Sequence, residues 1–232
     1  MSPQLCLGTA QFGLSYGITN THGLVKETEV QALLRDASSA GISWLDTAQA
    51  YGEAESVLGR TIEVGNDFKF ISKLAKQINP IFTPKDFGLW DRLLDGTLTR
   101  LRIPCLDVLL LHSSEDLRKQ GSQFLRQWLV AVKASGLVKR LGVSIYEASE
   151  LDGIADELLD VVQLPLSLYD QRLSNDGTIT RLCSRGCAVH ARGVFLQGLF
   201  FKPIENSNNS TPISAGSSRS PISSDIPITV NR

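Results

Sequence analysis

The stretch Leu106-Asp107-Val108-Leu109-Leu110-Leu111-His112 decides the fold class of this 232-residue chain. It is a short apolar run that ends at a polar residue, and such runs are typical of strands buried on both faces of a parallel sheet. Similar runs occur along the whole chain, at Leu5–Thr9, Ile42–Asp46, Lys69–Lys73, Val138–Ser144, Val161–Leu164 and Cys187–Ala191. The segments between them carry apolar residues at helical spacing, as Leu125, Trp128, Leu129 and Val132 do.

This alternation of strand and helix predicts an α/β fold of parallel strands joined by right-handed crossovers. Two architectures meet the pattern, a closed barrel and an open doubly wound sheet. The loop after the first run, Gly8-Thr9-Ala10-Gln11-Phe12-Gly13, contains no G-x-G-x-x-G turn, which weakens the open sheet of dinucleotide-binding type. We therefore predict a TIM barrel of the (β/α)8 type.

The barrel is expected to be incomplete, with about seven β/α units. From Lys202 the sequence turns to Ser, Asn, Pro and Thr, with too few apolar residues to offset the entropy of ordering. We expect a barrel domain over 1–201 and a disordered tail over 202–232. Residues 226–230 are a weaker alternative, a surrogate eighth strand, because Pro227 interrupts them. Otherwise the first and seventh strands keep open edges, through which the chain could self-associate.

Composition excludes several classes of partner. The 23 basic and 24 acidic residues give a net charge of −1, which provides no positive field for nucleic acid or an anionic membrane surface. There is no membrane-spanning run and no secretion signal, so a cytoplasmic protein is expected. Cys183, Cys187 and His190 lack the second pair of ligands that a zinc site needs, and no metal is expected.

Polar residues end three consecutive runs, and catalytic groups of such barrels lie at the carboxyl ends of strands. These residues are Asp46, Lys73 and His112, and Tyr51 follows five residues after Asp46. Neighbouring strands are about 4.8 Å apart, so the four side chains can converge at one mouth. Each alone has an ordinary structural explanation, such as a helix cap, a packed ring or a solvated strand end. Their joint occurrence predicts a catalytic site.

The chemistry expected of these four residues is acid catalysis by the Tyr51 phenol. Its unperturbed pKa of about 10 must fall for easy proton donation, and a Lys73 ammonium is expected to lower it. Asp46 would keep Lys73 charged, and a neutral His112 would donate a hydrogen bond to a substrate oxygen. This set suits reduction of a carbonyl, with hydride from a dihydronicotinamide and the proton from Tyr51.

The segment Gly41–Glu55 contains G-x-x-x-x-D-T-A-x-x-Y-G and resembles the signature of the aldo-keto reductase family. Lys73 and His112 match the family's other two catalytic positions, and Gly136–Ser144 resembles its fifth-strand segment. The resemblance covers roughly Leu5 to Phe200. It implies a (β/α)8 barrel and NAD(P)H-dependent reduction of an aldehyde or ketone, in which NADPH, or less often NADH, is the hydride donor. A sugar derivative is one possible substrate.

The resemblance also implies a set of cofactor-binding residues. Ser144 and Gln163 match positions that bind the nicotinamide carboxamide, and Thr9 matches one near the ribose. The segment Arg192–Leu199 matches the loop beside the pyrophosphate, which adds Arg192, Gln197 and Gly198 to the set. The family's final helix, eighth strand and basic helix terminus for the 2′-phosphate are not found in the sequence. We therefore expect a member truncated at its C-terminus, with weakened cofactor binding and uncertain activity.

Two other functions are compatible with the residues. A catalytically impaired barrel could serve as a binding or regulatory protein. Alternatively, Lys73 could act as the Schiff-base nucleophile of a lyase, although a carboxylate partner at Asp46 opposes the depressed lysine pKa which that chemistry needs.

Overall fold

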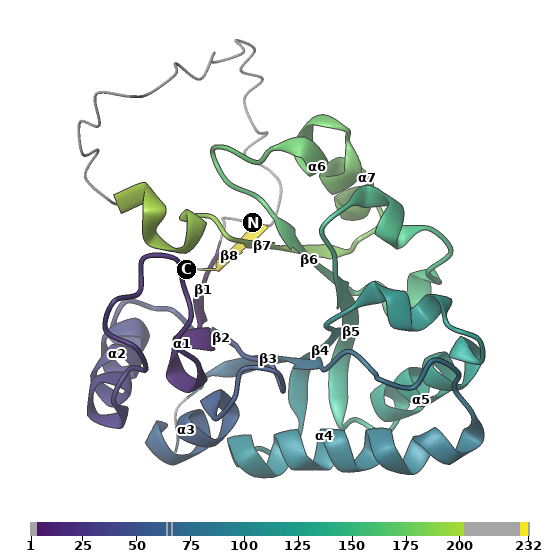
Figure 1. Ribbon diagram of the computed structural model, residues 1–232, viewed down its shortest axis with the longest axis horizontal. Helices are drawn as coiled ribbons and strands as arrows, with labels where there is room; N and C mark the ends of the chain where they lie inside the picture. Colours follow the sequence, from purple (N-terminus) through teal and green to yellow (C-terminus); the bar gives the residue numbers. More distant parts are fainter. Residues whose placement is uncertain (1–3, 64, 66, 202–227, 232) are drawn as a thin grey trace.

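The computed structural model describes residues 4–63, 65, 67–201 and 228–231 of the chain. Eight parallel strands form a closed barrel in sequence order, and β8 pairs with β1 to complete the circle. Figure 1 shows the strands curling around a common axis with the helices outside them. The predicted α/β barrel is therefore confirmed, and the open doubly wound sheet is excluded.

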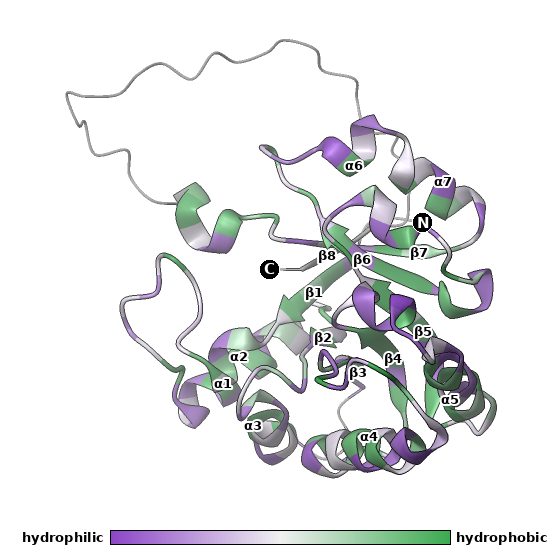
Figure 2. Ribbon diagram, turned by 45° about the vertical axis from the view of Figure 1, so that its right-hand side comes forward, coloured by the Kyte–Doolittle hydropathy of each residue, from purple (hydrophilic) through white to green (hydrophobic). Residues whose placement is uncertain are grey.

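Each apolar run of the sequence forms a strand whose ends lie within two residues of the expected ones. The strands are β1 (Gln4–Gly8), β2 (Trp44–Asp46), β3 (Lys69–Leu74), β4 (Leu106–Leu111), β5 (Val138–Ser144), β6 (Val161–Pro165), β7 (Ala188–Arg192) and β8 (Ile228–Asn231). The helices are α1 (Ala10–Gly13), α2 (Glu27–Ser39), α3 (Ala54–Thr61), α4 (Phe87–Leu101), α5 (Ser122–Ala134), α6 (Arg172–Asn175) and α7 (Thr178–Ser184). The long helices turn their apolar side towards the sheet (Figure 2).

Short 3-10 helices replace an α-helix in part of the barrel. They are η1 (Pro84–Asp86), η2 (Ser114–Arg118), η3 (Ala148–Leu151), η4 (Asp156–Leu158) and η5 (Leu196–Phe201). The crossover from β5 to β6 contains only η3 and η4. Its Gly153 has φ +75° and separates the two, because the left-handed conformation ends a helix. This unit therefore departs from the predicted alternation of strands and longer helices.

Strand β8 corrects the expectation of open edges. It pairs with β7 through Val189 and Ile228 and with β1 through Leu5 and Val230, so both neighbouring strands have partners. The weaker alternative, a surrogate eighth strand, is thus the one found, shifted by one or two residues. Its residues come from the segment assigned to the tail, so the barrel sheet extends beyond residue 201. The expected disorder of 202–227 lies outside the described residues, and the domain division stays a prediction.

Alternation along the strands separates two apolar clusters. In β4, Val108 and Leu110 belong to a small cluster inside the barrel, whereas Leu109 and Leu111 pack against the surrounding helices. This is the period-two pattern of a strand in a filled barrel. The inner cluster is completed by Cys6, Trp44, Ile71 and Val161. Of the helices in the described ranges, none is both long and apolar enough to cross a membrane.

Candidate active site

The same alternation directs the polar strand ends into the mouth of the barrel. Asp46 lies two residues after the interior Trp44, Lys73 two after Ile71, and His112 two after Leu110. On the opposite side, Gln163 lies two residues after Val161. Residues two positions apart on a strand share one face. The inward side chains at the carboxyl end of the sheet are therefore polar, although the layer below them is apolar.

Asp46 and Lys73 form a buried ion pair at the centre of the site. The Lys73 ammonium donates a hydrogen bond to Asp46 Oδ1, and a second one of 2.9 Å to the carbonyl oxygen of Thr47. Lys73 is 1% exposed and Asp46 is 3% exposed. A charge pair this deep is tolerated only when both partners are well hydrogen-bonded.

Two further residues fix Asp46. Gln163 Nε2 donates a hydrogen bond of 2.8 Å to Asp46 Oδ2, and the Thr9 hydroxyl donates one of 2.9 Å to the Asp46 carbonyl oxygen. Thr9 and Gln163 were predicted to contact the cofactor. In the structure both contact Asp46, Gln163 through the carboxylate and Thr9 through the backbone carbonyl, and their contact with a cofactor stays a prediction.

Tyr51 reaches the ion pair from the loop between β2 and α3. The distance from Lys73 Nζ to the Tyr51 hydroxyl is 3.4 Å, and the ammonium lies 4.9 Å from the ring centroid. Two glycines allow the loop to approach. A Cβ at Gly13 would lie 1.9 Å from the Tyr51 carbonyl oxygen, and Gly52 has φ +55° with a Cβ position 2.4 Å from the Gly13 oxygen. Only glycine fits both positions without displacing the loop.

The net pKa of Tyr51 is raised, although Lys73 acts to lower it as expected. Burial of the phenol raises the pKa, and this effect outweighs the opposing charge of Lys73. For Lys73, burial lowers the pKa, but Asp46 and Tyr51 more than compensate and the net pKa is raised. At neutral pH the site thus holds a phenol and an ammonium. A charged Lys73 is not a nucleophile, so this protonation state opposes the Schiff-base alternative.

His112 lies beside Tyr51 at the end of β4. The two rings meet edge to face with centroids 5.9 Å apart. Burial, together with the charge of Lys73, lowers the pKa of His112 to about 4. Its imidazole is therefore neutral at neutral pH, as predicted, and carries one N–H donor.

The other predicted cofactor residues lie in three places in the fold, at the end of β5, at the end of β7 and in η5. Ser144 is buried at the end of β5, beside Gln163 in the register of β5 and β6. Arg192 ends β7, opposite Pro165 of β6. Gln197 and Gly198 lie in η5 and are next to the loop between α1 and α2. Gln197 accepts hydrogen bonds from Ile18 N at 3.1 Å and from the Thr19 hydroxyl at 2.7 Å.

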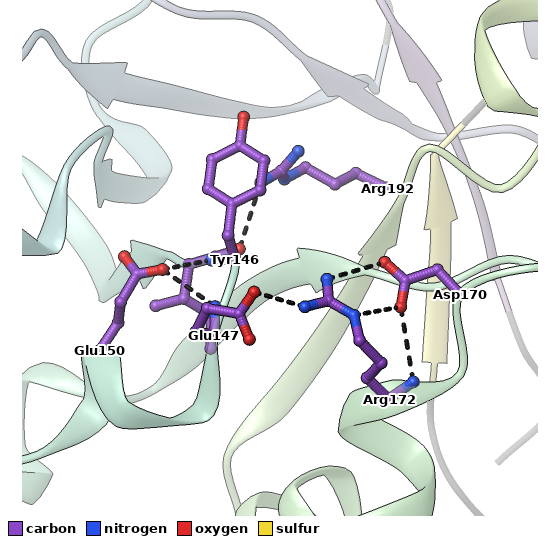
Figure 3. Close-up of polar contacts among 7 residues, drawn as sticks. Tyr146, Glu147, Glu150, Asp170, Arg172 and Arg192 are labelled. Atoms are coloured by element: carbon purple, nitrogen blue, oxygen red, sulfur yellow. Dashed lines mark hydrogen bonds and ion pairs between the residues drawn. The ribbon is translucent and has the colours of Figure 1, made fainter.

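A network of charged residues joins the loops at the rim above β4, β5 and β6. Arg172 contacts Glu147 and also binds Asp170, with 2.9 Å between Nε and Oδ1 (Figure 3). Glu150 accepts hydrogen bonds of 2.7 Å from both Tyr146 N and the Ser114 hydroxyl. Loops that come from three different strands are therefore held to one another around the mouth.

Sequence reasoning missed the residues that act through their backbone. The Thr47 carbonyl oxygen is a partner of Lys73, and Gly13 and Gly52 determine where Tyr51 lies. The Tyr51-Gly52 pair in the sequence was an available signal for a tight turn. Nothing in the sequence singled out Gly13, because its contact with Tyr51 is tertiary.

The model of the Aldo/keto reductase family matches residues 4–223. A search of curated proteins found no match.

Solved structures with the same fold include several aldo-keto reductases. A putative aldo-keto reductase from Pseudomonas aeruginosa is 22% identical, with a TM-score of 0.67 over 83% of this chain and 73% of that one. One from Bacillus halodurans, in its holo form, is 18% identical, with a TM-score of 0.69 over 90% and 68% of the two chains. One from Klebsiella pneumoniae in complex with NADPH is 22% identical, with a TM-score of 0.60 over 82% and 63%.

Proposed function

Because the chain belongs to the aldo/keto reductase family, we propose that it reduces an aldehyde or ketone to an alcohol with a nicotinamide cofactor. The observation that carries this proposal is the buried Asp46–Lys73 pair in contact with the Tyr51 hydroxyl, 3.4 Å from Lys73 Nζ. The neutral imidazole of His112 beside the Tyr51 ring completes the set. An acid, a cation that stabilises its anion and a hydrogen-bond donor are what reduction of a carbonyl needs.

The residues at the mouth fit a nicotinamide cofactor. Ser144 and Gln163 lie side by side at the ends of β5 and β6, and a hydroxyl with an amide matches the hydrogen-bonding groups of a carboxamide. We propose that these two residues hold the nicotinamide of NADPH or NADH, with Thr9 close by. We further propose that Gln197 and Gly198 contribute to binding the phosphates. When bound, the reduced cofactor would supply the hydride that the carbonyl carbon accepts.

The chain's own residues would manage the proton. Tyr51 is a phenol at neutral pH and therefore has a proton to donate to the carbonyl oxygen. Burial raises its pKa, and the charge of Lys73 works against that rise. Lys73 would stabilise the resulting phenolate through their direct contact, and Asp46 would keep Lys73 charged. His112 would orient the substrate by donating a hydrogen bond to the same oxygen. The proton returns to Tyr51 from solvent after the alcohol leaves.

The test is a cofactor titration followed by reduction assays on wild type and Tyr51→Phe. We expect saturable binding of NADPH or NADH to both proteins, measured by the fluorescence of the reduced cofactor. Reduction of a panel of aldehydes should fall by about 100-fold or more in Tyr51→Phe, because the general acid is lost. Tyr169→Phe is the matched control, since Tyr169 is 79% exposed. Wild type that binds cofactor but reduces no carbonyl would contradict the proposal and favour a binding or regulatory protein.

A further inference from the structure

Arg192 is a cation at the rim of the barrel. Unlike other cations of the site, it is not paired with a carboxylate of the described residues. Arg172 is balanced by Glu147 and Asp170, and Lys73 by Asp46. Arg192 forms no ion pair with a carboxylate in the described part of the chain. Its Nη2 donates one hydrogen bond of 3.1 Å, to the carbonyl oxygen of Ile145.

The guanidinium of Arg192 is nevertheless held in place. Its carbon lies 4.0 Å from the centroid of the Tyr146 ring, which is a close cation–π contact. Figure 3 shows the side chain extending from β7 to this ring, whereas Arg172 turns to Glu147 and Asp170. Tyr146 is in turn fixed through its backbone N–H, which donates to Glu150. Stacking restricts the side chain before any ligand arrives, so little entropy is lost on binding.

Donor groups of Arg192 remain without acceptors. Nε is buried and has no hydrogen-bond partner among the described residues, and Nη1 bonds to none of them. A buried donor without an acceptor is rare and often marks a site for a water, an ion or a ligand. The Asp170 carboxylate forms its hydrogen bonds with Arg172, at 2.9 and 3.1 Å, and forms none with Arg192, although the charge of Arg192 contributes to lowering the pKa of Asp170.

The position of Arg192 points to the substrate side of the mouth. After burial and the charge of Lys73, the charge of Arg192 also contributes to lowering the pKa of His112. Arg192 reaches across β6 to contact Ile145, the residue that directly follows Ser144 at the end of β5. Tyr146 is 61% exposed and presents its ring to solvent at the same rim. A ligand with a negative charge that binds near His112 would therefore be attracted by Arg192. This cation forms no ion pair with a carboxylate of the described residues.

We propose that Arg192, stacked on Tyr146, binds an anionic group of the substrate, so that the preferred substrates are carboxylate-bearing aldehydes or ketones. This inference rests on the proposed function and specifies its substrate class. It also changes the role of Arg192, which the sequence assigned to the cofactor. A planar guanidinium with free N–H donors is well suited to a carboxylate. The carbonyl of such a substrate would lie towards His112 and Tyr51, and its carboxylate at the rim.

The experiment compares two aldehydes of nearly equal shape, 4-carboxybenzaldehyde and the uncharged 4-formylbenzamide. We expect wild type to favour the carboxylate in kcat/KM, and Arg192→Met to lose about 10- to 100-fold on the carboxylate alone, mainly through KM. Arg192→Lys should retain part of the preference. Arg118→Met is the matched control, because Arg118 is an exposed cation at the same rim that donates to the Ser149 carbonyl oxygen.

A second measurement separates this inference from the proposed function. Binding of benzoate is followed calorimetrically in wild type and Arg192→Met, each with and without NADP⁺. Loss of benzoate binding in Arg192→Met, with NADPH affinity unchanged, supports the inference even if no carbonyl is reduced. Equal losses on both aldehydes, or a weakened affinity for NADPH, overturn it, and the latter assigns Arg192 to the cofactor phosphates. Reduction of both aldehydes with no preference also overturns it, while leaving the proposed function intact.

Discussion

At the scale of single residues, the stability of the site depends on the buried pair of Lys73 and Asp46. Neither charge has access to water, and each keeps its partners through hydrogen bonds to Thr47, Tyr51 and Gln163. Such a pair adds little net stability relative to an apolar pair, but removal of one member leaves a buried charge uncompensated. The pair is therefore better explained by the chemistry it serves than by stability.

We predict that Lys73→Met lowers the free energy of unfolding by about 3–5 kcal/mol, because the buried Asp46 carboxylate loses the cation that balances its charge. The double variant Asp46→Asn with Lys73→Met should recover more than half of that loss while remaining inactive. Urea unfolding measures both. Lys139→Met is the control, since its ion pair with Asp107 involves a lysine side chain 59% exposed and should be worth less than about 1 kcal/mol. Equal effects at Lys73 and Lys139 would contradict the burial argument.

The sequence was informative about which residues meet, but less so about their electrostatics. Polar ends of apolar runs identified Asp46, Lys73 and His112, because strand parity and parallel order together determine where such side chains point. The direction of the Tyr51 pKa could not be predicted, since it depends on how far burial outweighs the charge of Lys73. Nor could the bond from Gln163 to Asp46, which joins residues 117 positions apart.

At the scale of elements, the helix α1 and the loop that carries Tyr51 pack backbone to backbone. The glycines at 13 and 52 permit this contact, which transmits the position of α1 to the catalytic phenol. Helix α1 lies directly after Thr9, whose hydroxyl bonds to the Asp46 carbonyl oxygen. The end of β1 thus supports both Asp46 and Tyr51.

We predict that Gly13→Ala displaces the Tyr51 loop, because its Cβ would lie 1.9 Å from the Tyr51 carbonyl oxygen and 2.3 Å from Ala54 N. Overpacking of this kind costs about 1–3 kcal/mol of stability. A displacement of the phenol near 1 Å can reduce kcat about 100-fold. Thermal unfolding and carbonyl reduction together measure the effect. Gly88→Ala in α4 is the control, since its Cβ would meet only Arg92 Nη1 at 3.6 Å, and unchanged activity in both variants would refute the prediction.

Element order was largely predictable from the sequence. The conformation of the crossover from β5 to β6 and the presence of strand β8 were less so. The strands follow the apolar runs because both faces of each strand are buried. The crossover from β5 to β6 forms 3-10 turns, since the Asp152-Gly153 pair interrupts a continuous helix. Strand β8 has little sequence signal of its own, and the two edges that it pairs with decide its conformation.

At the scale of the whole molecule, closure of the sheet depends on the four residues of β8. We predict that deleting 228–232 destabilises the barrel and promotes self-association, because β1 and β7 would each lose a hydrogen-bonded neighbour. Light scattering coupled to size-exclusion chromatography gives the mass, and thermal unfolding gives the stability. A deletion variant that stays monomeric and melts at the wild-type temperature would show that β8 is dispensable for closure.

The stability of the whole barrel should also depend on pH through two histidines, the buried His190 and the partly buried His112. Burial lowers the pKa of both His112 and His190 to about 4, from the ordinary histidine value of 6.5. Each imidazole is neutral in the folded chain and binds a proton on unfolding once the pH is below 6.5. The unfolded state then binds more protons, so stability is fully present above pH 6.5 and is lost as the pH falls towards 4.

We predict a loss of up to about 3 kcal/mol for His190 over this window, at about 1.4 kcal/mol per pH unit. Asp86 and Asp170 have lowered pKa values and act in the same direction, but at lower pH, since the ordinary aspartate pKa is 3.8. Urea unfolding at a series of pH values between 4 and 7 measures the slope. His190→Gln should flatten the slope whatever its effect on stability at pH 7, because the titrating group is gone. The exposed His22 provides the control, since His22→Gln should leave the slope unchanged. An unaltered slope in His190→Gln would mean that this imidazole does not titrate on unfolding.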